Sequence, residues 1–437
     1  MADVTPIRTP AEQALAAAYD GARGKLPGKG AVASLREDAF KRFDAKGLPT
    51  RRVEEWKYTD LRTGLREALP LAAPPDATAK ANAKDAGAVF AALKPRKLTF
   101  VDGAFVAELS DLTPEAGLSI GSMAEALTKG DAEVTARLGK TFETDDIAVA
   151  LNTALMGDGV VIRVAAGAAL KRPLHLVFVT LSKASSFTRS LVVVEKGARV
   201  AIAESHEGVA AQVNTTLELI VGDEAEVDYY KVVANRGVHL GSLMLSAGKK
   251  ARFDTFVLNH DVGIVRNQSF VRFAGQHSKG AMRGVNLLRA EEHVDNTLLI
   301  EHAAAHCAGR EQFKAVLDGE SHSVFQGKIV VNPGAQKTDS KMMTRALLLS
   351  DAAEADNKPE LEIFADDVVC GHGATAGALD PTLKFYLMSR GIDEAQAESL
   401  LIQAFIGETV EEIADEGFRD AIMNAALAWL ATREVKA

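Results

Sequence analysis

The chain has 437 residues, 47% of them hydrophobic and 25% charged, and its 50 basic and 59 acidic side chains give a net charge of −9. This length is enough for a sizeable core in two or three domains. The acidic balance speaks against nucleic-acid binding, and two cysteines exclude a disulfide framework. No run approaches the about eighteen apolar residues of a membrane span, and no signal peptide is visible, so we expect a cytoplasmic protein.

The N-terminal part of the chain predicts helices followed by a charged block. Helical spacing of apolar residues covers 11–22 and continues from residue 31 towards Gly47, with a glycine-rich break between the two stretches. The block TRRVEEWKYTDLR, residues 50–62, is dense in charge around Trp56 and Tyr58.

A linker and a hairpin are expected next. Residues 70–88 are rich in Ala, Pro and Asp and poor in large apolar side chains, which predicts a flexible linker. Residues 97–108 alternate around Asp102-Gly103, which predicts a hairpin. We therefore assign residues 1–148 to an N-terminal helical region with a linker and a hairpin.

Residues 149–380 predict a mainly β core. From Gly159 onward, short apolar and β-branched runs alternate with Gly, Asp, Asn and Lys, without a helical period. A Gly-x-x-small pattern recurs at Gly222, Gly248 and Gly275, at spacings of 26 and 27 residues. One coil of this length cannot bury its inward face alone, so the repeat predicts stacked coils of a β-solenoid.

Residues 381–437 predict two closing helices. Asp393-x-x-Gln396 and Thr409-x-x-Glu412 are capping-box patterns, each followed by an apolar helical face. From the pattern alone, these helices cap the solenoid or offer a docking surface.

Two motifs resemble enzyme signatures without the context that those signatures need. Ser119 lies in a G-x-S-x-G pattern, but the buried strand that should precede a nucleophile elbow is missing. Residues 371–376 fit G-x-G-x-x-A, but Gly377 and Pro381 prevent the helix that a dinucleotide site requires. A phosphate-binding loop is also absent from the sequence, so nucleotide hydrolysis by this chain is not expected.

The pattern His302-x-x-x-His306-Cys307 favours structural side chains over a metal site. The residues between the two histidines are all alanine, so the glutamate of H-E-x-x-H is missing. The segment also lies among predicted strands, where positions four apart are separated by about 13 Å.

The most chemically suggestive cluster is Cys370-Gly-His372. In an extended segment, positions i and i+2 point to the same face, so the thiol and the imidazole project together. Such a pair suits soft-metal ligation or a nucleophile with its base. The alternative is a small buried cysteine beside a histidine in a turn.

A count of thiols limits any role with iron–sulfur clusters. A cluster takes four protein ligands, mostly thiolates. With two cysteines far apart and no C-x-x-C, this chain cannot readily hold a complete cluster alone. No cofactor is therefore expected on the isolated chain, and a cluster would need ligands from another subunit.

Three blocks of sequence resemble the SufD family of the SUF iron–sulfur cluster assembly system, within the SufB/SufD superfamily. They are PTRRVEEWKYTDLR at 49–62, HVDNTLLIEHAAAHCAGREQFKAVLDGESHSVFQGKIVV followed by AQKTDSKMMTRALLLS, and DNKPELEIFADDVVCGHGATAGALD at 356–380. The last string, with its C-x-HGAT-x-G core, is the most specific of the three.

The resemblance implies a right-handed parallel β-helix core between helical regions, and a scaffold subunit without catalysis of its own. It implies a SufB–SufC–SufD complex, in which the last coils pair with the paralogue SufB and the helices at 392–437 dock the ABC-type ATPase SufC. His372 would be the candidate ligand for iron or a nascent, transient cluster at the SufB interface, with Cys370 as its neighbour. A homodimer is conceivable for the isolated chain.

Three alternatives remain open at this stage. SufB itself shares the core, although the N-terminal block, the DNKPELEI string and the scarcity of cysteine favour SufD. A solitary β-helix enzyme could use Cys370 and His372 as a nucleophile–base pair. A purely structural solenoid would only stabilise its partners.

Overall fold

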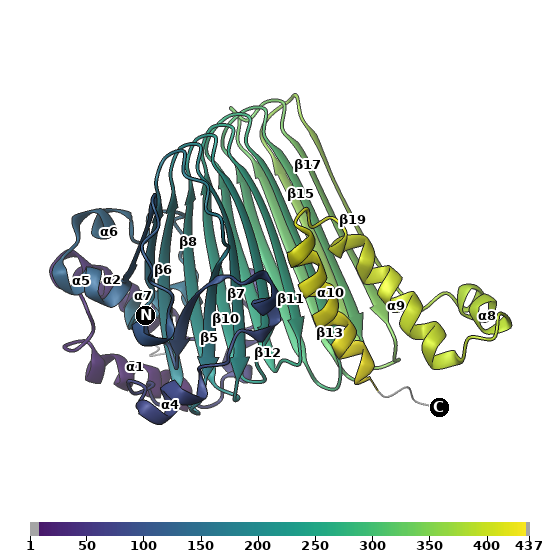
Figure 1. Cartoon of the computed structure of the whole chain (residues 1–437), viewed down its shortest axis with the longest axis horizontal. Helices are drawn as coiled ribbons and strands as arrows, with labels where there is room; N and C mark the ends of the chain where they lie inside the picture. Colours follow the sequence, from purple (N-terminus) through teal and green to yellow (C-terminus); the bar gives the residue numbers. More distant parts are fainter. Residues whose placement is uncertain (1–7, 434–437) are drawn as a thin grey trace, which may run out of the picture.

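The computed structural model describes residues 8–433, and its centre is a parallel β-solenoid (Figure 1). Each coil contributes one strand to each of two facing sheets. The ten-stranded sheet has the order β19-β17-β15-β13-β11-β9-β7-β5-β1-β2, and the nine-stranded sheet has the order β18-β16-β14-β12-β10-β8-β6-β4-β3. All pairs are parallel except β1 with β2 and β3 with β4. The expected mainly β solenoid is confirmed.

The strands of the ten-stranded sheet are β1 (Arg96–Val101), β2 (Ala104–Phe105), β5 (Leu174–Thr180), β7 (Arg199–Gly208), β9 (Glu226–Ala234), β11 (Arg252–His260), β13 (Lys279–Leu288), β15 (Ala308–Leu317), β17 (Asp339–Leu348) and β19 (Val369–Gly377). Those of the nine-stranded sheet are β3 (Leu118–Ser122), β4 (Val160–Val164), β6 (Ser185–Val194), β8 (Gln212–Val221), β10 (Val238–Ala247), β12 (Ile264–Phe273), β14 (His293–His302), β16 (His322–Val331) and β18 (Glu354–Ile363).

The helices before the solenoid are α1 (Pro10–Ala22), α2 (Ala31–Lys46), α3 (Leu61–Gly64), α4 (Ala77–Asn82), α5 (Met123–Lys129), α6 (Ala132–Arg137) and α7 (Ile147–Leu155), with 3-10 turns η1 (Glu54–Trp56), η2 (Ala88–Leu93) and η3 (Ala107–Leu109). The helices after it are α8 (Pro381–Ser389), α9 (Glu394–Val410) and α10 (Glu416–Ala431). Within residues 8–433, none of these helices combines the length and apolar character needed to cross a bilayer.

A column of left-handed residues explains the repeat seen in the sequence. One residue per coil adopts a positive φ of 57–63° and donates its backbone N–H to a carbonyl of the next coil at 2.6–3.2 Å: Glu224, Lys250, His277, His306 and Lys337. The small residue after each of them is buried: Ala225, Ala251, Ser278, Cys307 and Thr338. The Gly-x-x-small signature is therefore a corner at which successive coils stack.

The glycine of the signature is needed because neighbouring coils approach closely at this corner. A Cβ on Gly275 would lie 2.0 Å from the backbone nitrogen of Lys249 in the preceding coil. The coils also grow toward the C terminus. Val238 pairs with Ile264, whereas the in-register partner of His322 is Glu354. After Gly275 the spacing therefore lengthens, and the corner position three residues before Cys307 and Thr338 carries Ala304 and Ala335 in place of glycine.

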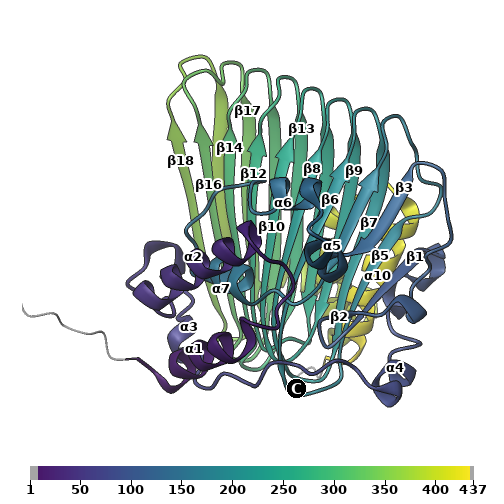
Figure 2. The ribbon, with the colours of Figure 1, turned by 90° about the vertical axis from the view of Figure 1, so that its left-hand side faces the viewer.

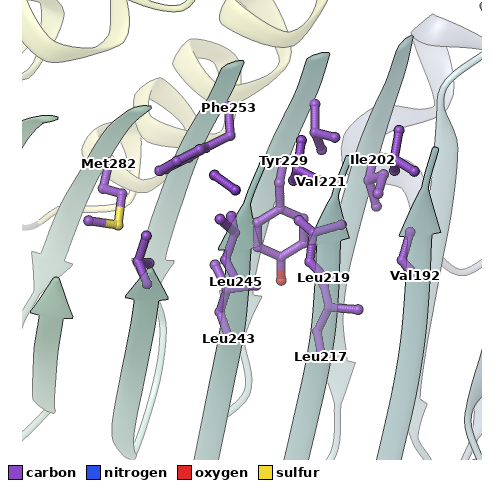
Figure 3. Close-up of a cluster of buried hydrophobic side chains, with 14 of the residues drawn as sticks. Val192, Ile202, Leu217, Leu219, Val221, Tyr229, Leu243, Leu245, Phe253 and Met282 are labelled. Atoms are coloured by element: carbon purple, nitrogen blue, oxygen red, sulfur yellow. The ribbon is translucent and has the colours of Figure 1, made fainter. Parts of the chain in front are cut away.

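Apolar side chains from both sheets fill most of the lumen (Figure 3). Their columns follow the register, so that Leu219, Leu245 and Val271 continue one another along the nine-stranded sheet. Close stacking of identical backbone paths places like side chains over one another, which accounts for a continuous core made from short, individually weak strands.

The N-terminal helices cover part of the nine-stranded sheet (Figure 2). The expected helices at 11–22 and 31–47 correspond to α1 and α2. Asp102 and Gly103 both have positive φ in the tight turn between β1 and β2, so the predicted hairpin is confirmed. Strand β1 also pairs in parallel with β5, which carries this hairpin into the ten-stranded sheet.

The segment at 70–88 is ordered against the solenoid, so the prediction of a flexible linker is wrong. The Ala72 N–H donates to the carbonyl of Ser185 at 2.9 Å, the segment contains α4, and Ala83 is fully buried. The linker was predicted because this alanine-rich segment has few large apolar residues. Its short side chains nevertheless let its backbone pack closely against the solenoid.

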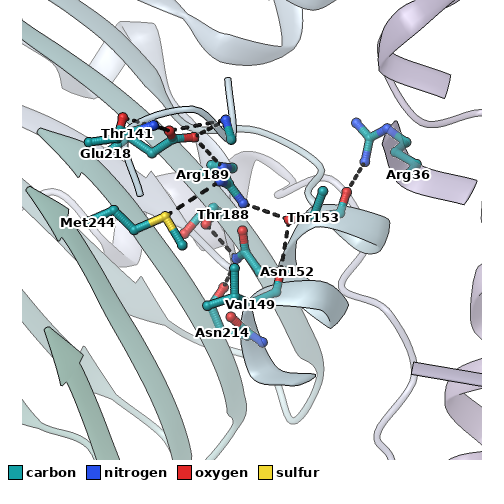
Figure 4. A network of polar contacts seen from close by, with 11 residues as sticks. Arg36, Thr141, Val149, Asn152, Thr153, Thr188, Arg189, Asn214, Glu218 and Met244 are labelled. Atoms are coloured by element: carbon teal, nitrogen blue, oxygen red, sulfur yellow. Dashed lines mark hydrogen bonds and ion pairs between the residues drawn. The ribbon is translucent and has the colours of Figure 1, made fainter. Parts of the chain in front are cut away.

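A buried polar network fastens the N-terminal region to the sheet (Figure 4). Arg189 on β6 pairs with Glu218 on β8 at 2.8 Å, and both side chains are buried. Arg189 also donates to the hydroxyl of Thr153 on α7, and Glu218 accepts from the hydroxyl of Thr141, both at 2.8 Å. Since every charge in this network has a partner, the desolvation cost of burying it is offset.

Three helices follow the solenoid, where two were predicted. The Asp393 carboxylate accepts from the backbone N–H of Gln396 and begins α9 as expected. The second capping prediction is wrong. Thr409 is buried inside the last turn of α9, and α10 begins after Asp415, whose side chain accepts from the N–H of Phe418.

Helices α9 and α10 lie on the outer face of the ten-stranded sheet, whereas α8 projects past its last strand (Figure 1). Lys314 on β15 is completely buried beneath α9, where its ammonium contacts the carbonyl of Phe405 and lies 2.6 Å from the carboxylate of Glu408. Phe418 on α10 packs against Phe90 of η2, so the two terminal regions meet on this sheet.

Candidate functional site

The last coil of the solenoid ends in two open strand edges. β18 is the terminal strand of one sheet and β19 of the other, and no described segment pairs with their outer sides. Both strands are partly or largely exposed along their length, unlike the buried strands before them. An uncovered parallel edge presents a row of unpaired backbone groups, which is a template for pairing with another chain.

Apolar side chains add to this open end. Phe364 is 60% exposed and Val369 is 63% exposed, and Ile363 beside them is also exposed. They flank the turn between β18 and β19. Exposed apolar groups next to an unpaired edge are typical of a protein–protein interface.

Cys370 and His372 lie on β19 and belong to the lumen-facing side of the strand. Their in-register neighbours on β17 are Ser340 and Met342, both of which are buried. Cys370 also packs against the main apolar core, while His372 is exposed. The structure therefore brings the two residues to one face of the edge strand, at the mouth of the lumen.

The surroundings of Cys370 raise the pKa of its thiol and so favour the neutral form. Burial raises the pKa of this thiol, and the nearby carboxylates of Asp339 and Glu311 raise it further, against a hydrogen bond from the backbone at Ser340. A preformed thiolate–imidazole pair would need a lowered thiol pKa, so the direction of this shift speaks against a nucleophile–base role.

The two residues do not form a complete metal site by themselves. Within residues 8–433, no three or more His, Cys, Asp or Glu side chains are grouped so that they could hold a metal ion. The role of Cys370 and His372 as ligands therefore stays a prediction that requires donors from a partner.

The other histidine and serine motifs do not form the sites that their sequence patterns resemble. His302 stacks on Phe273 with ring centroids 4.3 Å apart, whereas His306 stacks on His277 in the corner column. Cys307 is the buried small residue of its corner. Ser119 lies inside strand β3, without the sharp strand-to-helix turn of a nucleophile elbow.

A second exposed apolar surface lies on α8, which the sequence did not predict as a helix. Its side chains Leu383, Phe385, Tyr386 and Met388 are all exposed, and Phe385 is 73% exposed. Lys384 joins α8 to α9 through ion pairs with Glu394 at 2.6 Å and Glu398 at 2.8 Å. The helix is thus anchored on one side and presents its apolar residues outward.

These features define a class: a β-solenoid protein with two exposed apolar surfaces, one at its open end and one on its C-terminal helices. Comparison with known families agrees with this. Residues 177–405 match the family model described as SUF system FeS cluster assembly, SufBD core domain, and residues 12–176 match the SufBD protein N-terminal region.

The chain belongs to the SufBD family of iron–sulfur cluster assembly proteins of the SUF system. It is 29% identical to an iron–sulfur cluster assembly SufBD family protein of Synechocystis sp., over 87% of each chain. It is also 29% identical to the iron–sulfur cluster assembly protein SufD of Escherichia coli, over 86% of this chain and 88% of that one. SufD of Bacillus subtilis is 28% identical over 63% of this chain and 65% of its own length.

Proposed function

We propose that this protein is the SufD-type scaffold subunit of a SufB–SufC–SufD complex and is not catalytic alone. The open end of the solenoid pairs with the paralogous SufB, and the C-terminal helices dock the ATPase SufC. The observation that carries the proposal is the uncovered end, where two strand edges, exposed apolar side chains and the pair Cys370 and His372 coincide. In the isolated chain the same edges are available to a second copy, which gives a homodimer.

At the shared end, His372 serves as a ligand for incoming iron or a nascent cluster, with Cys370 beside it. SufB supplies the thiolates that this chain lacks, because a cluster needs about four ligands and the chain has two cysteines. The cluster is cargo that passes through the interface in the complex.

The contacts beneath α9 and α10 offer a route for motion from the ATPase. Lys314 ties β15 to α9, and Arg283 on β13 reaches Glu412, between α9 and α10, at 3.5 Å. ATP-driven dimerisation of SufC would shift these helices, and the buried Lys314 would carry the shift into the sheet two strands from β19. The interface between this chain and SufB, which His372 lines, then opens and admits iron and sulfide.

A His372→Ala variant is expected to lower maturation of iron–sulfur enzymes by about tenfold or more, the usual scale for losing one group of a metal site. Enzyme activities are measured in cells that lack the wild-type copy. His306→Ala is the control, because that imidazole lies in the corner column, and its removal is expected to leave maturation unchanged. Normal maturation with His372→Ala would contradict the assigned role.

A Phe385→Ser variant is expected to release SufC while SufB stays bound. An exposed aromatic anchor contributes about 2 kcal/mol or more at an interface, which weakens binding about thirtyfold. Val209→Ser is the matched control, since Val209 is an exposed apolar residue on a turn between β7 and β8. Equal SufC retention in the two variants, measured by affinity purification, would place the ATPase elsewhere.

A further inference from the structure

The lumen contains two buried glutamates in very different surroundings. Glu204 accepts a hydrogen bond from the Tyr229 hydroxyl at 2.8 Å, contacts His206 Nε2 at 2.6 Å, and lies 3.4 Å from the ammonium of Lys231. Glu311, on β15, is equally buried, but its Oε2 has no hydrogen-bond partner. A buried carboxyl without a partner is costly and calls for a physical explanation.

Three donor atoms converge beside Glu311 because residue 309 is glycine. A Cβ on Gly309 would lie 2.7 Å from Ser340 Oγ, 2.8 Å from Glu311 Oε1 and 3.4 Å from His302 Nε2. The His302 nitrogen and the Ser340 hydroxyl are themselves 3.2 Å apart. A carboxylate oxygen of Glu311, the hydroxyl of Ser340 and the imidazole nitrogen of His302 thus surround a point that the Cβ of any other residue at position 309 would fill.

We propose that Glu311, His302 and Ser340 form a binding site for a divalent first-row transition-metal ion inside the lumen, separate from the site at the open end. Carboxylate and imidazole donors suit such ions. The donors lie 2.7–3.4 Å from the Cβ position, so shifts of about 0.5–1.4 Å bring them to the distance of about 2.0–2.2 Å that these metal bonds require. The ion would lie further into the lumen than the Cβ position, which is at bonding distance from the Gly309 Cα. The cation also supplies the counter-charge that Glu311 lacks.

The position of this site gives it a place in the proposed function, on which this part of the inference rests. In the strand register, Gly309 lies beside Ser340 and Ser340 beside Cys370, while Met342 separates Glu311 from His372. Two inter-strand spacings, about 10 Å, therefore separate the two sites. One carboxylate, one imidazole and one hydroxyl bind a metal ion weakly enough for the ion to exchange. The lumen site is thus a staging point for iron on its way to the open end.

The test is a titration of the full isolated chain with Co(II), whose visible absorption reports nitrogen and oxygen coordination, repeated anaerobically with Fe(II). Wild type is expected to bind one ion at the lumen. Glu311→Gln keeps the shape of the side chain but not its charge, and Gly309→Ala fills the space between the donors. Each is expected to weaken binding about tenfold or more. Unchanged thermal unfolding of Glu311→Gln shows that the fold is retained.

Two control variants separate this site from others. His306→Ala removes an imidazole of the surface pair, and His372→Ala removes the proposed ligand at the open end; both are expected to keep the lumen-bound ion. Equal affinity in Glu311→Gln and wild type, or loss of the ion in His306→Ala alone, would overturn the inference. A different outcome would separate the two proposals. If metal binding depended on Glu311 but the chain retained neither SufB nor SufC in co-purification, the metal site would be upheld and the proposed function contradicted.

Discussion

An Ala374→Pro substitution is expected to abolish retention of SufB while the chain stays folded. The Val369 N–H donates to the carbonyl of Thr338, directly before β17, and alternate residues of a parallel strand point their backbone groups to opposite sides. The backbone groups of Cys370, His372 and Ala374 therefore face outward from the edge. Proline at 374 removes one outward donor and leaves the β17 ladder intact, because edge strands tolerate proline on their free side.

The expected size of this effect follows from the unmet hydrogen bonds. Leaving one or two partner groups unpaired costs about 1–3 kcal/mol each, or about 1–6 kcal/mol in total, which weakens binding about fivefold to more than ten-thousandfold. Co-purification of the tagged chain with SufB provides the measurement. Ala374→Ser, which keeps the backbone N–H, is the control. A folded Ala374→Pro variant that retained SufB as well as wild type would rule out edge pairing through β19.

An Arg189→Met substitution is expected to lower the free energy of unfolding by about 3–5 kcal/mol. The substitution leaves Glu218 buried beside Thr141 without its cation, and it removes the hydrogen bond from Arg189 to Thr153 on α7. Urea unfolding of the isolated chain measures the loss. The double variant Arg189→Met with Glu218→Leu is expected to recover most of it, because no uncompensated charge remains.

An exposed ion pair supplies the control for this experiment. Lys129 and Glu125 lie 3.0 Å apart on α5, with both side chains largely exposed. Lys129→Met is expected to change the free energy of unfolding by less than about 0.5 kcal/mol. If Arg189→Met were as mild as this control, the buried pair would not be what fastens the N-terminal region to the solenoid.

The solenoid could be predicted from sequence because its corners repeat a local requirement. The Gly-x-x-small pattern at Gly222, Gly248 and Gly275 reports close backbone approach, a left-handed residue and a buried small side chain, all within four positions. The hairpin at Asp102-Gly103 was predictable for the same reason, since its turn depends on two adjacent residues.

Features that depend on distant contacts were not predictable in this way. The cap pattern at Thr409 was overridden because α9 continues while it packs on the sheet, and α8 lacks the buried apolar face that marks a helix in sequence. The pairing of Cys370 and His372 on one face followed from strand alternation. The convergence of Glu311 with His302 and Ser340 did not, because three different strands supply the donors and only the register brings them together.

The most direct test of the central claim is the native mass of the full chain after co-expression with SufB and SufC and affinity purification. We expect a stable three-component assembly that loses SufC, but keeps SufB, when residues 381–433 are deleted. A chain that purifies alone, or that retains SufC after this deletion, would contradict the assignment of the open end and the C-terminal helices as its two docking surfaces.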